Sequence, residues 1–242
     1  MTVFVGTSGW SYAHWEGVLY AHGTPPRGRL DVYVRHFRTV EVNSTFYRWP
    51  GARAFRSWFE RTPDEFLFGV KAPRGLTHGS KLYAPERWVG RIARDLSGLR
   101  HKRGVLLVQL PPALGYDHAR LAYFLACLPA GLRVAVEFRH PSWHREEVFA
   151  LLESRGAAYC VMSGAGLPCV LRATAGFVYA RLHGPDRGHL YGGSYTDDDL
   201  RWWAARVREW EAQGRDVLVY FNNDGGGNAV RNAGRLKRLL AL

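Results

Sequence analysis

The chain has 242 residues, which suits one large domain, and its composition excludes several classes of protein. Hydrophobic residues make up 47% of it, which is enough for a sizeable core. No apolar run approaches the length of a membrane span, and the N-terminus has no basic region followed by a long apolar stretch. We therefore expect a single domain over residues 1–242, with no signal peptide and no membrane partner.

The cysteines and the net charge indicate the cellular setting. Cys127, Cys160 and Cys169 are odd in number and show no metal-type spacing, which favours a reduced, cytoplasmic location. The formal charge of +12 favours an anionic partner, with nucleic acid among the candidates. Only four of the 33 basic residues are lysine and the arginines are spread along the chain, so a solvated basic surface explains the charge equally well. Nothing in the sequence indicates an oligomeric state.

Short apolar segments alternate along the chain with amphipathic segments of helical period. The predicted strands are 3–6, 38–44, 66–71, 104–110, the first part of 132–143, 157–162, 177–183 and 216–223. The predicted helices are 31–37, 54–61, 86–99, 117–128, 146–154, 196–213 and 228–240. Residues 72–83 are predicted to form a long polar loop. Residues 163–175 have no helical period, so the sixth helix is expected to be short or missing.

This alternation predicts an α/β fold with a parallel sheet and crossover helices. Eight strand–helix units in roughly 250 residues are typical of a closed (β/α)8 barrel of the TIM type. A doubly wound open sheet is the alternative.

The fifth strand shows how the faces of the sheet divide. Side chains alternate across a strand, so Val134, Val136 and Phe138 share one face, which suits packing against helices. The opposite face carries Glu137 and Arg139 near the carboxyl end of the strand. Charges on an inner face are costly unless they are paired or used, so this strand indicates a site.

The same alternation in the other strands brings polar groups to one end of the barrel. The predicted inward set is Ser8, Glu41, Asn43, Lys71, Gln109, Glu137, Arg139, Arg181, His183, Asn222 and Asp224. Active sites of this fold lie at that end, so we expect a functional pocket there. The fixed charges balance, with three acidic residues against three basic ones, and a self-neutralising structural network is therefore the alternative.

Two glycine-rich turns and several aromatic residues follow predicted strands. Turns 6–9 and 224–228 can present backbone amides to an anion. Five aromatic residues lie just past the predicted strand ends and can stack on a base or a sugar: Trp10, Trp15, Tyr47, Trp49 and Trp143. His183, Glu137 and Asp224 have the chemistry of metal ligands, but no ligand spacing supports a metal and we expect none. No cofactor is indicated.

Seven motifs together resemble the DUF72, or YecE-like, family. They run in order over almost the whole chain: Gly6-Thr7-Ser8-Gly9-Trp10-Ser11-Tyr12, Val42-Asn43-Ser44-Thr45-Phe46-Tyr47, Val70-Lys71-Ala72-Pro73, Gln109-Leu110-Pro111-Pro112, Glu137-Phe138-Arg139-His140-Pro141-Ser142-Trp143, Arg181-Leu182-His183-Gly184 and Tyr220-Phe221-Asn222-Asn223-Asp224. The resemblance implies a TIM-type barrel, in agreement with the pattern of elements. It implies little about the chemistry.

The leading functional hypothesis is an enzyme, a hydrolase or a lyase, that acts on a phosphate-containing or other anionic substrate. The expected catalytic residues are Glu137, His183, Lys71 and Asp224, with Glu137 or His183 as the acid or base. The expected substrate-binding residues are Ser8, Trp10, Glu41, Asn43, Tyr47, Gln109, Arg139, His140, Arg181, Asn222 and Asn223. Among these, the arginines and Lys71 would hold negative charge, and the amides would orient the substrate.

Two other hypotheses remain open. A nucleic-acid-binding module would grip a strand with the aromatic and basic barrel mouth. A glycoside hydrolase would use Glu41 and Glu137 as its carboxylate pair, which requires a separation of about 5–10 Å with a sugar between them.

Overall fold

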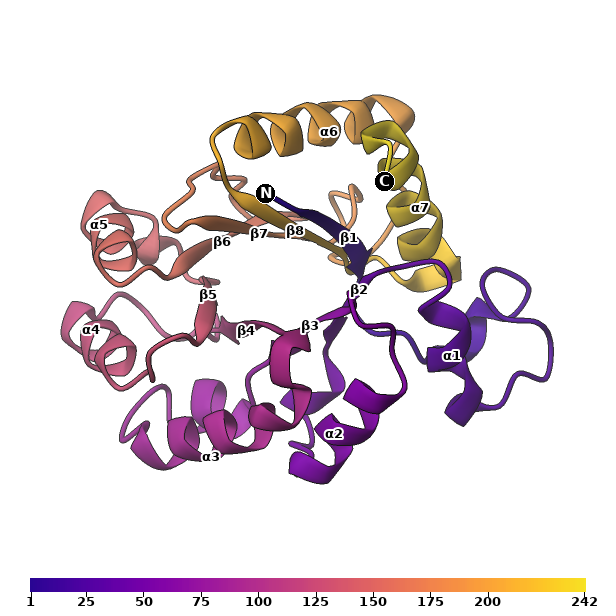
Figure 1. Ribbon diagram of the computed structural model, residues 1–242. Helices are drawn as coiled ribbons and strands as arrows, with labels where there is room; N and C mark the ends of the chain where they lie inside the picture. The colour runs from indigo at the N-terminus through magenta and orange to yellow at the C-terminus, as the bar shows by residue number, and fades with distance from the viewer.

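Eight parallel strands surround a central axis in the computed structural model, which describes residues 1–242 (Figure 1). The strands are β1 (Val3–Thr7), β2 (Thr39–Val42), β3 (Leu67–Lys71), β4 (Arg103–Gln109), β5 (Arg133–Glu137), β6 (Ala158–Ser163), β7 (Phe177–Leu182) and β8 (Asp216–Phe221). From β2 to β8, each strand pairs with its neighbour in the sequence, and β1 pairs with β8. Between β1 and β2, Ser8 bridges to Glu41 and the Gly9 N–H donates to the Glu41 carbonyl at 2.7 Å. The predicted barrel is confirmed, and the open-sheet alternative is wrong.

The helices lie around the outside of the strands (Figure 1). They are α1 (Arg29–Tyr33), α2 (Ala52–Glu60), α3 (Glu86–Leu96), α4 (His118–Ala126), α5 (Glu146–Ser154), α6 (Asp197–Ala212) and α7 (Asn228–Leu240). No helix joins β6 to β7, as the missing period of residues 163–175 predicts. No helix is both long and apolar enough to cross a bilayer.

Two local predictions differ from the structure. The helix predicted at 31–37 is the shorter α1, which begins and ends earlier in the chain. The predicted polar loop 72–83 contains a helical turn, Gly75–Gly79, in which Leu76 and Thr77 are buried. The Ser80 N–H closes this turn by donating to the Gly75 carbonyl at 2.7 Å, and so short a segment carries no periodic pattern.

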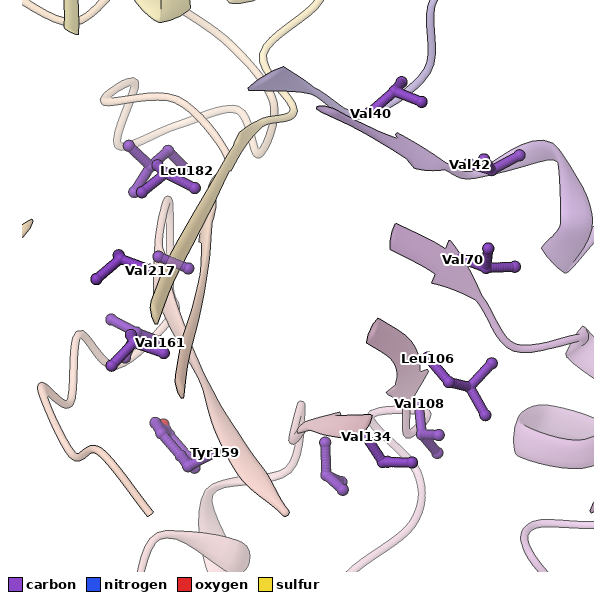
Figure 2. Packing of buried hydrophobic residues seen from close by; sticks show 14 of the residues in the cluster. Val40, Val42, Val70, Leu106, Val108, Val134, Tyr159, Val161, Leu182 and Val217 are labelled. Carbon is purple, nitrogen blue, oxygen red and sulfur yellow. The ribbon is translucent and has the colours of Figure 1, made fainter. Parts of the chain in front are cut away.

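The outer faces of the strands pack against the helices and carry β-branched and other apolar side chains. Figure 2 shows these side chains pointing away from the barrel axis: Val40, Val42, Val70, Leu106, Val108, Val134, Tyr159, Val161, Leu182 and Val217. A separate apolar cluster fills the barrel interior and includes Ala135 and Leu218. Val134 therefore faces the helices and Ala135 faces the interior, as the alternation in the fifth strand predicts.

A glycine on β3 makes room for two tyrosines inside the barrel. A side-chain carbon added at Gly69 would lie 3.0 Å from the Tyr179 hydroxyl oxygen and 3.1 Å from that of Tyr220. The Tyr220 hydroxyl lies 2.7 Å from the Thr39 hydroxyl, and the Tyr179 hydroxyl donates to Glu41 at 2.6 Å. The tyrosines thus link the apolar interior to the charged groups near the carboxyl ends of the strands.

Candidate functional site

Arg181 is the central charged group inside the barrel and has no exposed surface. Its Nε and Nη2 donate to the Glu41 carboxylate at 2.9 Å and 2.8 Å, and its Nη1 donates to Glu137 Oε2 at 2.6 Å. Such forked bonds match the planar guanidinium to a carboxylate and hold both groups in a single geometry. We call Arg181, Glu41, Glu137, Arg139 and His183 the Arg181 cluster.

The two glutamates of the cluster are fully buried and have several donors each. Glu41 also accepts hydrogen bonds from the hydroxyls of Ser8 and Tyr179, and Glu137 accepts one from Arg139 Nε. Burial by itself would raise the pKa of Glu137, but Arg181 and Arg139 outweigh it and hold that pKa below its ordinary value of 4.5. Glu137 is therefore a permanently ionised partner of the arginines at neutral pH.

His183 is held as a neutral acceptor. Its Nε2 lies 3.1 Å from Arg181 Nη1 and 2.9 Å from Arg139 Nη2, and guanidinium groups can only donate. The proton must then sit on Nδ1, which lies 3.2 Å from the Ser163 carbonyl. Burial, together with the two arginines, lowers the pKa of His183 well below its ordinary range. Because the Nε2 lone pair already accepts from the arginines, His183 is disfavoured as a catalytic acid or base.

A pocket of about 500 Å³ opens above the cluster at the carboxyl ends of β1, β2, β3 and β8. Its volume is in the range of small-molecule sites. We call it the mouth pocket, and its lining residues are Gly9, Trp10, Ser11, Tyr12, Asn43, Ser44, Tyr47, Lys71, Tyr191, Asn222 and Asp224. It lies at the end of the barrel where enzymes of this fold carry out their chemistry.

Lys71, the last residue of β3, lines this pocket and is only 9% exposed. Its ammonium group lies 4.4 Å from the centre of the Phe46 ring and has no hydrogen-bond or ion-pair partner in the protein. Burial, and next the charge of Arg181, lower the pKa of Lys71 from 10.5 to about 8. The two arginines of the cluster are matched by its two glutamates, so Lys71 is the one positive charge left without compensation there.

The predicted site residues separate into three groups. Six line the mouth pocket: Trp10, Asn43, Tyr47, Lys71, Asn222 and Asp224. Six belong to the Arg181 cluster or bond to it: Ser8, Glu41, Glu137, Arg139, Arg181 and His183. Three lie outside both groups: Gln109, His140 and Asn223. The structure thus brings twelve of the fifteen together, as a pocket and a charged layer beneath it.

Two of the three remaining residues, His140 and Asn223, make local hydrogen bonds that account for their positions. His140 Nδ1 accepts from the Ser142 N–H at 3.2 Å and caps the turn Pro141–Trp143. Asn223 Nδ2 donates to the Gly193 carbonyl and to Asn232 Oδ1, both at 2.9 Å. Gln109, beside Glu137 in the sheet register, has a buried side-chain oxygen without a partner.

Two expectations about anion contacts need correction. The amides of turn 6–9 are occupied by barrel closure, because Ser8 N–H donates to the Phe221 carbonyl and Gly9 N–H to that of Glu41. Arg181 donates to two carboxylates and has no exposed surface, so it cannot touch a ligand in the pocket. Sequence patterns place such groups at the right end of the barrel but cannot show that their donors are already used.

Several lining residues were missed by the sequence reasoning. Tyr12 and Ser44 lie in two of the seven motifs quoted above, just past β1 and β2, and their position after a strand could have identified them. The Tyr12 hydroxyl donates to the Ser8 carbonyl at 2.8 Å, which fixes the ring at the pocket wall. Tyr191 lies in the long connection between β7 and α6, where no period marks it.

Comparison with known proteins agrees with this architecture. The model of the family described as "Protein of unknown function DUF72" matches residues 4–242. The UPF0759 protein YunF of Bacillus subtilis (strain 168) is 29% identical, over 99% of this chain and 95% of that protein. The UPF0759 protein YecE of Escherichia coli (strain K12) is 30% identical, over 58% of this chain and 50% of that protein.

Solved structures show the same barrel. A DUF72 family protein (TM1631) from Thermotoga maritima MSB8 is 29% identical over the full length of both chains, with a TM-score of 0.89. A DUF72 family protein (EF0366) from Enterococcus faecalis V583 is 20% identical and covers 100% of this chain and 96% of that one, with a TM-score of 0.88. SacUVDE, at 10% identity over 99% of this chain and 98% of that one and a TM-score of 0.60, shares the fold alone. The chain therefore belongs to the DUF72 family.

Proposed function

We propose that the protein is an enzyme whose mouth pocket binds a small anionic substrate, a phosphate-containing compound being the best match, and that Lys71 attracts it. The observation that carries the proposal is the uncompensated ammonium of Lys71, which is nearly buried and has no partner in the protein. Burying an unpaired charge is costly, and an anionic ligand would offset that cost.

The Arg181 cluster supports this proposal indirectly. It is neutral as a unit and its arginines and glutamates are bonded to one another, so it provides a rigid floor and no free charge. Rigid polar groups beneath a pocket hold the residues above them in position. Here Ser8 links the two levels, because its hydroxyl donates to Glu41 and accepts from Asn43 Nδ2 at 2.7 Å.

The other lining groups suit the orientation of a polar substrate. Asn43 Oδ1 is buried without a hydrogen-bond partner, which leaves an acceptor for a substrate hydroxyl or amide. Asn222 lines the same pocket from the carboxyl end of β8, and Asp224 is the only carboxylate among the lining residues. The pocket therefore offers one cation, two amides and one carboxylate to its ligand.

The structure disfavours the glycoside hydrolase hypothesis. Glu41 and Glu137 both bind Arg181, and neither has exposed surface, so neither can act on a sugar in the pocket. Among the aromatic residues expected to stack on a ligand, Trp15 and Trp143 are buried in the core, so that expectation is wrong for them. The nucleic-acid hypothesis is supported by the Tyr47 ring at the rim of the pocket, which is 82% exposed and free to stack on a base.

The test is a calorimetric titration with sulfate and with inorganic phosphate. We expect saturable binding to the wild-type protein at pH 7, a loss of at least about tenfold in Lys71→Met, and no change in the exposed-lysine control Lys81→Met. Sulfate keeps a constant charge over this range, so its affinity should fall above pH 8 as the Lys71 ammonium, whose pKa is about 8, loses its proton.

Two results would contradict the proposal. One is an absence of saturable heat at tens of millimolar of either anion, and the other is equal binding by Lys71→Met and wild type. A single-stranded oligonucleotide titrated at several salt concentrations tests the alternative, because strand binding by phosphate contacts weakens steeply with salt.

A further inference from the structure

Lys71 differs from the other three lysines of the chain in its surroundings. Lys102 donates to the carbonyls of Phe59 and Thr62 at 2.8 Å and 2.6 Å, and Lys237 donates to that of His36 at 2.6 Å. Lys81 is exposed. Lys71 alone combines near-complete burial, an unpartnered amine and a place in the wall of a pocket. An amine with those three properties is accessible to a bound molecule and is poorly solvated.

We propose that Lys71 is a nucleophile that forms an imine with the carbonyl carbon of a small anionic aldehyde or ketone. This inference rests on the proposed function, because the anionic part of the compound is what the pocket attracts. Two sources have the required chemistry: a 2-oxo acid, and a phosphorylated sugar in its open-chain form.

The reaction is balanced without an oxidant, a reductant or a cofactor. The lone pair of the neutral Nζ attacks the carbonyl carbon, a C–N bond forms as the C=O π bond breaks, and one proton passes from the nitrogen to the oxygen to give the neutral carbinolamine. The nitrogen lone pair then expels the hydroxyl group, which takes up one proton from solvent and leaves as water, and the product is a protonated imine. That cation has the same charge as the ammonium that it replaces, so the pocket stays matched to the anionic part of the ligand.

The surroundings of Lys71 supply the neutral amine that this step requires. Burial of the side chain and the nearby guanidinium of Arg181 both disfavour the ammonium form and lower the pKa of Lys71 to about 8. Roughly a tenth of the amine is then neutral at pH 7, compared with less than about a thousandth for an ordinary lysine.

Other lining groups fit the proton transfers and hydrogen bonds of this step. Asn43 Oδ1, which is buried without a hydrogen-bond partner, can accept a hydrogen bond from the carbinolamine hydroxyl. Asp224 is the only carboxylate that lines the pocket and is the group available there to accept the proton released by the attacking amine. These roles belong to residues that would touch the substrate, unlike the members of the Arg181 cluster beneath them.

Reductive trapping tests the inference. The wild-type protein is incubated at pH 8 with sodium cyanoborohydride and either pyruvate or glycolaldehyde phosphate, and the labelled peptides are mapped by mass spectrometry. We expect labelling at Lys71 to exceed that at Lys81 by at least tenfold with one of the two probes, and the productive probe tells a 2-oxo acid from a phosphorylated carbonyl. Labelling should vanish in Lys71→Arg and persist in the matched control Lys81→Arg.

The outcomes separate this inference from the proposed function. Lys71→Arg keeps the positive charge, so it should still bind sulfate while it loses trapping, and trapping by the wild type should rise from pH 6 to 8 where sulfate binding does not. Equal labelling of Lys71 and Lys81, or none at Lys71 with either probe, overturns the imine and leaves anion binding intact. The wild-type peptide map needs no variant, so a variant that fails to fold does not affect this result.

Discussion

Two buried cations at the same end of the barrel have opposite environments. Arg181 on β7 has no exposed surface and donates to two carboxylates, whereas Lys71 on β3 is 9% exposed and has no partner in the protein. Both lie on inner faces, and both follow from the same strand alternation. A buried charge that its neighbours match therefore holds the structure together, whereas an unmatched charge beside a pocket is available to a ligand.

The chemistry of the two side chains agrees with this division. A guanidinium offers several donors in a planar fork, so it can join two carboxylates from different strands, as Arg181 joins Glu41 of β2 and Glu137 of β5. An ammonium is a compact charge whose pKa shifts readily on burial, which suits binding and nucleophilic chemistry.

The largest expected effect is the loss of stability on removal of Arg181. Arg181→Met leaves two buried carboxylates without their common partner, so we expect a loss of about 3–5 kcal/mol in the free energy of unfolding, measured by denaturant titration. The matched control is Arg235→Met, which breaks a partly exposed ion pair with Asp197 and should cost less than about 1 kcal/mol. If Arg181→Met lowered the free energy of unfolding as little as the control does, Arg181 would not stabilise the fold, and the contrast with Lys71 would fail.

Glu137→Gln should lower the free energy of unfolding by about 3 kcal/mol at pH 7, somewhat less than Arg181→Met. The loss is smaller because a neutral acceptor remains for Arg139 and Arg181. The folded-state pKa of Glu137 is below its ordinary value of 4.5, so its stabilising contribution is complete above that pH and is lost as the pH falls. The difference between wild type and variant should therefore be constant from about pH 6 to 8 and shrink below about pH 4.5.

The measurement is a series of denaturant melts across this pH range, with Asp197→Asn as the exposed control. A stability difference that stayed constant down to pH 3 would show that the charge of Glu137 is not what holds the cluster together.

The smallest effect has the opposite sign. Lys71→Met removes an ammonium whose burial is not compensated, so in the absence of anions we expect a gain of roughly 1–3 kcal/mol at pH 7. The pKa of Lys71 is lowered from 10.5 to about 8, so the cost is complete below pH 8 and fades as the pH rises toward 10.5. The stability gained by Lys71→Met should therefore also decrease over this pH range.

Melts in buffers free of multivalent anions measure this gain, with Lys81→Met as the control that should not change. A clear destabilisation by Lys71→Met would show that Lys71 stabilises the fold as Arg181 does, and the distinction between the two cations would fail.

The sequence predicted much of the fold because its signals are local. In the fifth strand, Val136 and Glu137 are adjacent in the chain and lie on opposite faces, because a strand turns successive side chains to opposite faces whatever its partners are. The missing helix between β6 and β7 was also predicted, because a helix needs a period that residues 163–175 lack. The short turn at Gly75–Gly79 was not, because a single turn is too short to show a helical period.

Strand alternation alone assigns four charged residues to inner faces at one end of a barrel: Glu41, Lys71, Glu137 and Arg181. Which of these charges meet depends on how the strands are arranged in space. Arg181 and Glu41 are 140 residues apart, and their contact depends on how strands β2 and β7 are placed across the barrel. The same arrangement leaves Lys71 without a carboxylate. Pairing of charges is a property of distances in space, and side-chain periodicity carries no information about those distances.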